Sequence, residues 1–301
     1  MARNSEADPN TPEDTTRALV ERYRADGFVA VRGVLAREEI ETFRKAVDAA
    51  VARRSRRDRR TFDEKSPYGQ SFIQCIFLWE DAPDVRPLTF HPKIAGLAAD
   101  LLGAERVRLW HDQALYKEAG GRETEAHQDF GYWPVAEPDM VTAWIPLVDV
   151  DERNGCMGYV PGSQHSEREF VDIFNTPGAG NTYAARHAPP QYVPARMGDV
   201  IFHAARTVHM AMANKSGETR AVHTAVYFRD GCTRAVTGSD LPADRNGTLS
   251  GQPIEGPATP IAWPLPEGRF PTPAEWQNRG KVHEEFAAIG VLPMPGPRRP
   301  E

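Results

Sequence analysis

The sequence predicts a mainly β protein, a barrel or a sandwich, supported by helices in its amino-terminal third. Two observations predict this class. From about Val107 to Asp230, short strand-forming runs follow one another with Gly, Pro, Asn and Asp between them and no long helical pattern. Before Val107, three segments carry helical signals instead. We therefore expect a helical support followed by a β core.

The first helix is marked by its start signal. Thr11 offers a capping hydroxyl, Pro12 suits the first helical position, and the acids that follow face the positive end of the helix dipole. A second helix follows from apolar residues at spacings of three and four, such as Ile40, Val47 and Val51, which give it one buried face. The expected helices are 11–25, 36–55 and 94–102, with a strand over 28–31.

The strand-forming runs then follow in order. They are 107–117, 140–150, 155–163, 199–205, 207–213 and 220–230, and one more helix is expected over 275–289. We expect a single domain over 1–301. Its parts are a disordered lead (1–10), a helical support and lid (11–105), the β core (106–232) and a Pro- and Gly-rich wrapping tail (233–301).

Composition excludes several classes of protein. The 36 basic and 42 acidic residues give a net charge of −6, which argues against general nucleic-acid binding. The apolar runs are too short for a membrane-spanning helix, and the first residues carry no apolar stretch of a signal peptide. Three scattered cysteines exclude a disulfide framework and favour a reducing cytoplasm. We expect a cytoplasmic protein, a monomer or weak homodimer, that binds neither nucleic acid nor membranes.

The segment 53–60, RRSRRDRR, holds six arginines. One interpretation is a patch for phosphate or an anionic substrate, including a nucleic-acid module. The other is a solvated helix end, where cations offset the negative end of the dipole. The acidic balance of the whole chain favours the solvated end.

Three residues suggest a metal site. His127 and Asp129 are two apart, so they point to the same side if the backbone there is extended. His209 opens a later strand, and Arg220 follows eleven residues on. Two neutral nitrogens and one carboxylate make the facial triad of non-haem Fe(II), which leaves three coordination positions open. A 2-oxo acid takes two and dioxygen the third, and an Arg can hold the far carboxylate of that acid.

These residues lie in three strings: HQDFGYWP (127–134), TAWIPLVDVDERNGCMGYVPGSQH (142–165) and GDVIFHAARTVHMAMANKSGETRAV (198–222). In their order and spacing the strings resemble the phytanoyl-CoA dioxygenase family of Fe(II)/2-oxoglutarate oxygenases. The leading helix–strand–helix also resembles the support of that family. The resemblance implies a double-stranded β-helix, that is, a jelly-roll or cupin-like barrel. It also implies that Fe(II), 2-oxoglutarate and O2 take part in the reaction.

Residue roles follow from the resemblance. It implies that His127, Asp129 and His209 ligate iron, that Arg220 binds the far carboxylate of 2-oxoglutarate, and that Trp144 walls that pocket. Lys117 and Gln113 on the preceding strand are expected to face the cavity. On the substrate side we expect Phe130, Tyr132, Trp133, Trp79 and Arg206. Core packing is the alternative for the aromatic residues, and it is the favoured one for His203.

The function expected from this resemblance is hydroxylation, desaturation or cyclisation at an unactivated C–H of a small organic molecule. Natural-product biosynthesis or catabolism is the expected setting, with succinate and CO2 as co-products. An acyl-CoA hydroxylase and a non-catalytic metal-binding cupin are the alternatives. A zinc hydrolase with the same ligands is a third, since zinc also accepts two histidines and a carboxylate. It leaves Arg220 and Trp144 without a role.

Overall fold

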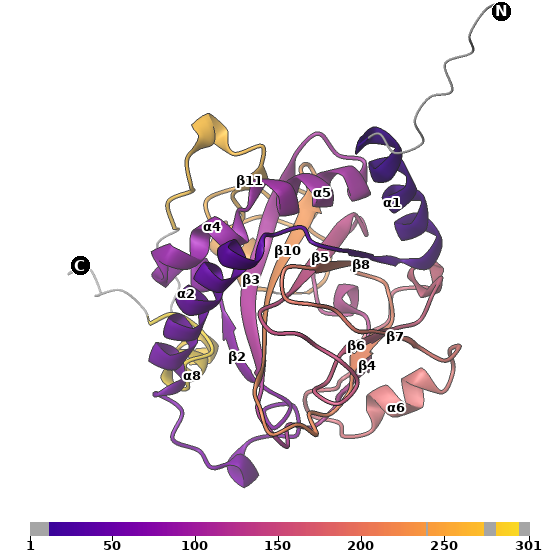
Figure 1. Ribbon diagram of the computed structural model, residues 1–301. Helices are drawn as coiled ribbons and strands as arrows, with labels where there is room; N and C mark the ends of the chain where they lie inside the picture. Colours follow the sequence, from indigo (N-terminus) through magenta and orange to yellow (C-terminus); the bar gives the residue numbers. More distant parts are fainter. Residues whose placement is uncertain (1–11, 239, 274–280, 295–301) are drawn as a thin grey trace, which may run out of the picture.

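The computed structural model describes residues 12–238, 240–273 and 281–294. Within these residues the chain forms two antiparallel sheets with helices packed beside them (Figure 1). The helices are α1 (Pro12–Asp26), α2 (Arg37–Ser55), α3 (Leu78–Asp81), α4 (Arg86–Thr89), α5 (Pro92–Leu102), α6 (Ala179–Ala184), α7 (Leu241–Arg245) and α8 (Lys281–Ala288). The strands are β1 (Phe28–Val31), β2 (Ile73–Ile76), β3 (Val107–Lys117), β4 (Thr124–His127), β5 (Met140–Pro146), β6 (Met157–Tyr159), β7 (Gln191–Val193), β8 (Val200–Ala204), β9 (His209–Ala211), β10 (Arg220–Arg229) and β11 (Ile261–Trp263). The mainly β class is confirmed.

The larger sheet has the strand order β1-β8-β5-β10-β3-β11, and β2 also pairs with β3. Strand β10 runs along one edge of β3, so β2 and β11 share the other edge at its two ends. The smaller sheet has the order β4-β9-β6-β7. Neighbouring strands in both sheets are antiparallel.

The two faces of the larger sheet meet different surroundings, because successive side chains of a strand point to opposite sides. On β5, Val141, Ala143 and Ile145 belong to the core that includes apolar residues of α2 and α5. Trp144 lies on the other face, in a core cluster with residues of the smaller sheet. The space between the two sheets is therefore separate from the core under the helices.

Most predicted elements are confirmed. Helices α1, α2 and α5 match the expected helices, and β1 and β3 match the runs 28–31 and 107–117 residue for residue. Strands β2, β4, β7 and β11 were not predicted, because three or four residues are too few to show an alternation. The short helices α3, α4, α6 and α7 were missed as well, because one or two turns are too short to show a helical period.

The carboxy-terminal part returns to the larger sheet, where β11 pairs with β3. Helix α8 falls within the expected helix 275–289, whose first part lies outside the described residues, as does the predicted disordered lead 1–10. No helix in the described ranges is long and apolar enough to cross a membrane.

The arginine run 53–60 is only partly the solvated helix end that the sequence favoured. Arg54 is 0% exposed. Its guanidinium donates to the carbonyls of Ile76 at 2.6 Å and Phe77 at 3.0 Å, and to Asp81 Oδ1 at 2.5 Å. A guanidinium has five N–H donors in a fork, so one buried Arg can satisfy several carbonyls at once. Arg54 therefore ties the end of α2 to β2 and α3.

Candidate metal centre

Three potential metal ligands converge where the smaller sheet begins. His127 of β4 and His209 of β9 are direct cross-strand partners, and their ring centroids are 4.3 Å apart. Gln128 has an extended backbone (φ −110°, ψ 129°), so Asp129 points to the same side as His127. Asp129 Oδ1 lies 3.7 Å from Nε2 of each histidine. The ligand atoms of all three residues lie within 4.8 Å of one another.

Backbone carbonyls fix the orientation of both imidazoles. Nδ1 of His127 lies 2.8 Å from the Glu125 carbonyl, and Nδ1 of His209 lies 2.9 Å from the Thr207 carbonyl. A carbonyl only accepts, so Nδ1 carries the proton and Nε2 offers its lone pair. Burial and, to a smaller extent, the nearby His127 lower the pKa of His209 to about 3, so the ring is neutral at pH 7. Both rings are thus in the tautomer that a metal ion requires.

Two side chains contact the second carboxylate oxygen of Asp129, Oδ2. Thr142 Oγ1 donates to Asp129 Oδ2 at 3.1 Å, and His203 Nε2 lies 3.4 Å from the same oxygen. Nδ1 of His203 in turn lies 3.3 Å from the Tyr159 hydroxyl. Burial alone would raise the pKa of Asp129, but His209 and the hydrogen bonds from the other two histidines outweigh it and hold that pKa well below its usual range. Asp129 is therefore an ionised carboxylate with one oxygen turned toward the ligand histidines.

The sequence did not single out Thr142, and it favoured core packing for His203. His203 is buried as expected, but its Nε2 also contacts the carboxylate of Asp129. A usable signal was present. In the predicted strand 140–150, Thr142 shares a face with Trp144, which was expected at the cavity. Thr142 and His203 are register partners of β5 and β8, a pairing that the sequence alone did not reveal.

A cavity of about 80 Å³ opens beside these ligands. Its lining comes from both sheets and from the segment before β2: Tyr68, Phe72, Gln113, Leu115, Thr124, His127, Asp129, Thr142, Trp144, Met157, His203, His209, Ala211, Arg220 and Thr224. The expected cavity residues Arg220, Trp144 and Gln113 are among them. Tyr68 and Phe72 carried no recognisable signal in the sequence.

Arg220 is a buried cation without an acidic partner. It is 2% exposed, its Nη1 donates to the Gly155 carbonyl at 3.1 Å, and its guanidinium lies 5.5 Å from the centre of the Trp144 ring. Its Nε has no hydrogen-bond partner, and neither has the buried hydroxyl of Thr224 on the same strand. In the described part of the chain, no carboxylate lies within 4.0 Å of Arg220. Burial lowers its pKa to about 10, so Arg220 stays charged at pH 7.

These features fit iron and a 2-oxo dicarboxylate together. The triad leaves coordination positions open for two oxygens of the acid. At another wall of the same cavity, an unpaired guanidinium and an unpaired hydroxyl suit a second carboxylate, because a buried charge is costly without a counter-charge.

Lys117 is the register partner of Arg220, but it does not line the cavity. Its ammonium donates to the Arg122 carbonyl and lies 3.4 Å from Thr124 Oγ1. Burial and, to a smaller extent, the charge of Arg220 lower the pKa of Lys117 to about 6. The structure therefore places Lys117 behind Thr124 and not in the lining.

The residues expected on the substrate side are dispersed. Phe130 and Trp133 are buried in an apolar cluster with Trp110. Tyr132 contacts the His127 ring, at 5.9 Å between centroids. None of these three lines the cavity.

Trp79 and Arg206 are not cavity residues either. Trp79 is buried on the helix side of the larger sheet, where it packs edge-on against Phe90 at 5.4 Å. The structure therefore gives it a place in the core and not in a lid. Arg206 lies in the loop between β8 and β9 and donates to the Ser166 carbonyl.

The family model for phytanoyl-CoA dioxygenase (PhyH) matches residues 23–222, which include all three candidate ligands and Arg220. The chain belongs to the phytanoyl-CoA dioxygenase family. One curated relative is the L-proline trans-4-hydroxylase of Streptomyces griseoviridis, 26% identical over 236 residues, 69% of this chain and 84% of that protein. Another is a probable alpha-ketoglutarate-dependent hypophosphite dioxygenase of Stutzerimonas stutzeri, 24% identical over 208 residues, 64% of this chain and 72% of that protein.

Solved structures of this kind are also similar. The non-haem alpha-ketoglutarate-dependent carbocyclase SnoK from nogalamycin biosynthesis matches with a TM-score of 0.69 and 31% identity, over 85% of this chain and 99% of that one. The epimerase SnoN of the same biosynthesis matches with a TM-score of 0.68 and 33% identity, over 86% and 100%. SnoN has been solved with Fe3+, alpha-ketoglutarate and nogalamycin RO.

The family, these relatives and the triad define the class of enzyme. This phytanoyl-CoA dioxygenase family member is a 2-oxoglutarate-dependent non-haem iron dioxygenase, with iron, 2-oxoglutarate and O2 as its cofactors and co-substrates.

Proposed function

We propose that this enzyme oxidises an unactivated C–H bond of a small organic molecule in natural-product biosynthesis, and that its outcome is hydroxylation, desaturation or ring closure. The reaction consumes 2-oxoglutarate and O2 and releases succinate and CO2. The support is the likeness to SnoK and SnoN, which exceeds 30% identity and spans nearly their whole length. We also propose that the two sheets form the double-stranded β-helix expected from the family resemblance.

The observation that carries the co-substrate assignment is the buried Arg220, which has no carboxylate partner among the described residues, with the unpartnered Thr224 hydroxyl in the same cavity lining. A zinc hydrolase or a metal-storing cupin needs the ligands but gives no reason to bury a cation in the same cavity. A dicarboxylate co-substrate gives that reason, because its far carboxylate would pair with the guanidinium in a dry site.

We assign the ligand roles as follows. Nε2 of His127, Nε2 of His209 and Oδ1 of Asp129 would hold iron. When bound, iron supplies the activation of O2 that is coupled to oxidative decarboxylation of 2-oxoglutarate. The protein's own part is orientation: the Glu125 and Thr207 carbonyls set the imidazole tautomers.

The remaining cavity residues would position the co-substrate. Arg220 would bind the far carboxylate, and the Thr224 hydroxyl, four residues along the same strand, would offer a further donor in the cavity. Trp144 closes the wall under Arg220 and excludes water from the charge pair, which strengthens it. Asp129 fills a position that must be vacant for a bound chloride, so oxidation of the substrate without halogenation is expected.

The acyl-CoA alternative has less support, because a CoA ester would need several free basic groups together. Four of the six arginines in 53–60 are already bound within the chain. Arg53 and Arg54 contact Asp81, Arg57 donates to carbonyls near α8, and Arg60 pairs with Asp58.

An anaerobic Fe(II) titration with and without 2-oxoglutarate tests this function. We expect a weak visible charge-transfer band that needs both components in the wild type and is absent in His209→Ala. An exposed-site control, Leu249→Ala, should keep the band. Absence of the band in iron-loaded wild-type protein would overturn the proposal. If the band forms, succinate release identifies substrates in a screen of candidate compounds.

A further inference from the structure

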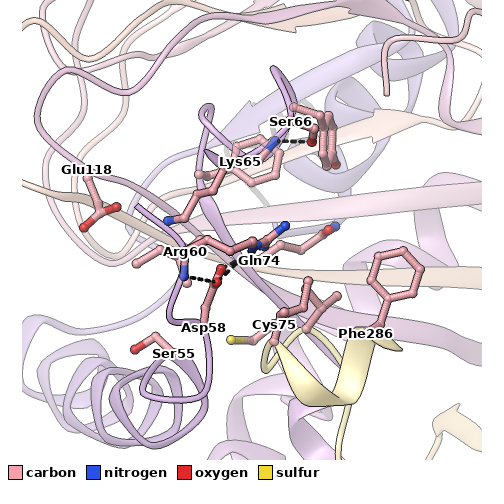
Figure 2. A pocket seen from close by; sticks show the side chains of 15 residues that line it. Ser55, Asp58, Arg60, Lys65, Ser66, Gln74, Cys75, Glu118 and Phe286 are labelled. Atoms are coloured by element: carbon pink, nitrogen blue, oxygen red, sulfur yellow. Dashed lines mark hydrogen bonds and ion pairs between the residues drawn. The ribbon is translucent and has the colours of Figure 1, made fainter. Parts of the chain in front are cut away.

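A second cavity lies next to the metal cavity and is much larger, about 350 Å³ against about 80 Å³. It lies between the carboxy-terminal end of α2, the segment before β2, β2 itself and α8 (Figure 2). Tyr68 and Phe72 line both cavities. The two spaces therefore adjoin at the side chains of these two residues.

The volumes of the two cavities favour binding of different molecules, or parts of molecules, in each. Pockets that bind small-molecule ligands usually measure roughly 300 to 1,000 Å³. The metal cavity is below that range, so 2-oxoglutarate would leave little room for a second molecule. The second cavity falls within the range.

The second cavity has an apolar and a polar side. Phe72, Phe286 and Val291 are among its apolar lining, and Phe286 is 44% exposed, a large apolar side chain at the surface. The polar side includes Lys65 and Ser66, as Figure 2 shows. Such a lining fits a molecule with an apolar ring face and a polar end.

The charges at the rim favour a negative polar end. Asp58 is already paired with Arg60, through contacts of 2.9 and 2.8 Å. Within the described ranges, no carboxylate lies within 4.0 Å of the Lys65 ammonium. Glu118 is the one further acid in the lining. The lining thus holds two cations and two acids, and Lys65 is the cation that is not already paired with a carboxylate of the described residues.

A hydrogen bond between two glutamines joins the linings of the two cavities. Gln74 lines the second cavity, and its amide donates to Gln113 Oε1 at 2.8 Å, while Gln113 lines the metal cavity. Gln74 also hydrogen-bonds to the side chain of Tyr68. A molecule in the second cavity therefore touches residues whose partners face the metal ligands.

We propose that this second cavity binds the non-reacting part of the substrate, and that the substrate is an amphipathic anion with an apolar ring system and an acidic group held by Lys65. The acidic group pairs with the ammonium, and the rings pack on Phe72, Phe286 and Val291. The role as a substrate chamber rests on the proposed oxygenase function. The binding site itself does not.

Two fluorescent probes with one ring system test the ligand class on the metal-free protein. They are 8-anilinonaphthalene-1-sulfonate, an anion, and N-phenyl-1-naphthylamine, which lacks the sulfonate. Lys65→Met should weaken binding of the anion about five-fold, the value of one partly exposed ion pair, and leave the neutral probe unchanged. Lys45→Met on exposed α2 surface is the matched control and should change neither probe.

The apolar side is tested in the same way. Phe286→Ala should weaken the binding of both probes about five-fold. Leu249→Ala, which removes another exposed apolar side chain, should weaken the binding of neither. Ser55→Trp, at the end of α2, should fill the cavity and abolish binding of both. Equal effects of Phe286→Ala and Leu249→Ala would overturn the site. Equal effects of Lys65→Met and Lys45→Met would overturn the anionic class.

The role as a substrate chamber has its own readout. In wild-type protein loaded anaerobically with Fe(II) and 2-oxoglutarate, saturating anionic probe should shift the visible band, because it lies against Tyr68 and Phe72. A band that forms but does not move would overturn the chamber and leave the oxygenase function intact. Failure of the band to form would overturn the oxygenase function, and the probe data on metal-free protein would still decide the site.

Discussion

The two faces of the larger sheet carry two clusters built from the same residue types. On the side of the smaller sheet, Asp129 has a threonine and a histidine at Oδ2, Thr142 at 3.1 Å and His203 at 3.4 Å. On the helix side, Asp112 of β3 also has a threonine and a histidine at Oδ2. These are Thr89 at 2.8 Å and His223 at 3.8 Å. We call them the open cluster and the sealed cluster.

The clusters differ at the other oxygen of each carboxylate. Oδ1 of Asp129 faces two more imidazoles across the cavity, whereas Oδ1 of Asp112 is buried with no hydrogen-bond partner. The pKa values diverge accordingly. Burial raises the pKa of Asp112 to about 7, while the histidines around Asp129 hold its pKa well below the usual range. The same residue types make a ligand set only where further basic groups and open space face the carboxylate.

The strongest way to separate the clusters is to remove each carboxylate. Asp129→Gly should abolish product formation, since Asp129 would be the only carboxylate ligand, while the metal-free protein keeps its fold. Asp112→Asn should retain Fe(II) binding and turnover. Succinate release and the melting temperature of the metal-free variants are the measurements. Full turnover in Asp129→Gly would remove Asp129 from the ligand set.

A second test concerns Arg220, the cation that lines the open cavity. Arg220→Met should weaken 2-oxoglutarate binding about 10- to 100-fold, because hydrogen bonds to a charged group contribute about 1.5 to 3 kcal/mol. Arg220→Lys keeps the charge without the fork and should lose less. Titration of the visible band with 2-oxoglutarate measures both. Equal affinity in all three proteins would show that the far carboxylate binds elsewhere.

The sequence could predict the open cluster's ligands but not its support. His127 and Asp129 are two residues apart, and together with His209, Arg220 and the family resemblance this spacing was enough to find them. Thr142 and His203 meet Asp129 only because β5 and β8 are neighbours in register. That pairing depends on the order of strands in the sheet, which periodicity does not encode.

The same limit applies to the residues expected on the substrate side, whose role stays a prediction. Phe130 and Trp133 follow the ligands directly, and nearness in sequence suggested the cavity mouth. The 3-10 turn η3 (Asp129–Gly131) redirects the chain, and both side chains enter an apolar cluster instead. Tyr68 and Phe72 line the cavity although they precede the ligand His127 by more than fifty residues in the sequence. Their contribution depends on tertiary packing alone.

A third test compares the two threonines. Thr142→Val and, separately, His203→Asn should lower metal affinity about ten-fold, because groups that hold a ligand carboxylate typically contribute 10- to 100-fold. Thr89→Val, the same change in the sealed cluster, should leave metal affinity unchanged. Competition titrations with Fe(II) or Co(II) measure the affinity directly, without turnover. If Thr142→Val and Thr89→Val gave equal affinities, Thr142 would have no positioning role.

The smallest effect expected is a pH dependence of stability that belongs to the sealed cluster. The folded pKa of Asp112 is raised to about 7, above the ordinary value near 3.9, because burial disfavours the carboxylate. The stabilisation is complete below the unfolded pKa and is lost as the pH rises through 7. The pKa of His223, lowered by burial to about 3, has the opposite sign, since its stabilisation is lost as the pH falls below about 6.5.

The two contributions oppose each other between pH 4 and 6.5, so the wild type alone would hide them. The difference between Asp112→Asn and wild type isolates the carboxylate. Relative to wild type, Asp112→Asn should gain on the order of 2 kcal/mol between pH 5 and pH 8, a shift of a few degrees in melting temperature. Denaturant unfolding of the metal-free proteins across this range measures it. A difference independent of pH would mean that Asp112 is ionised throughout, and the sealed cluster would then resemble the open one in charge although it has no open space for a metal.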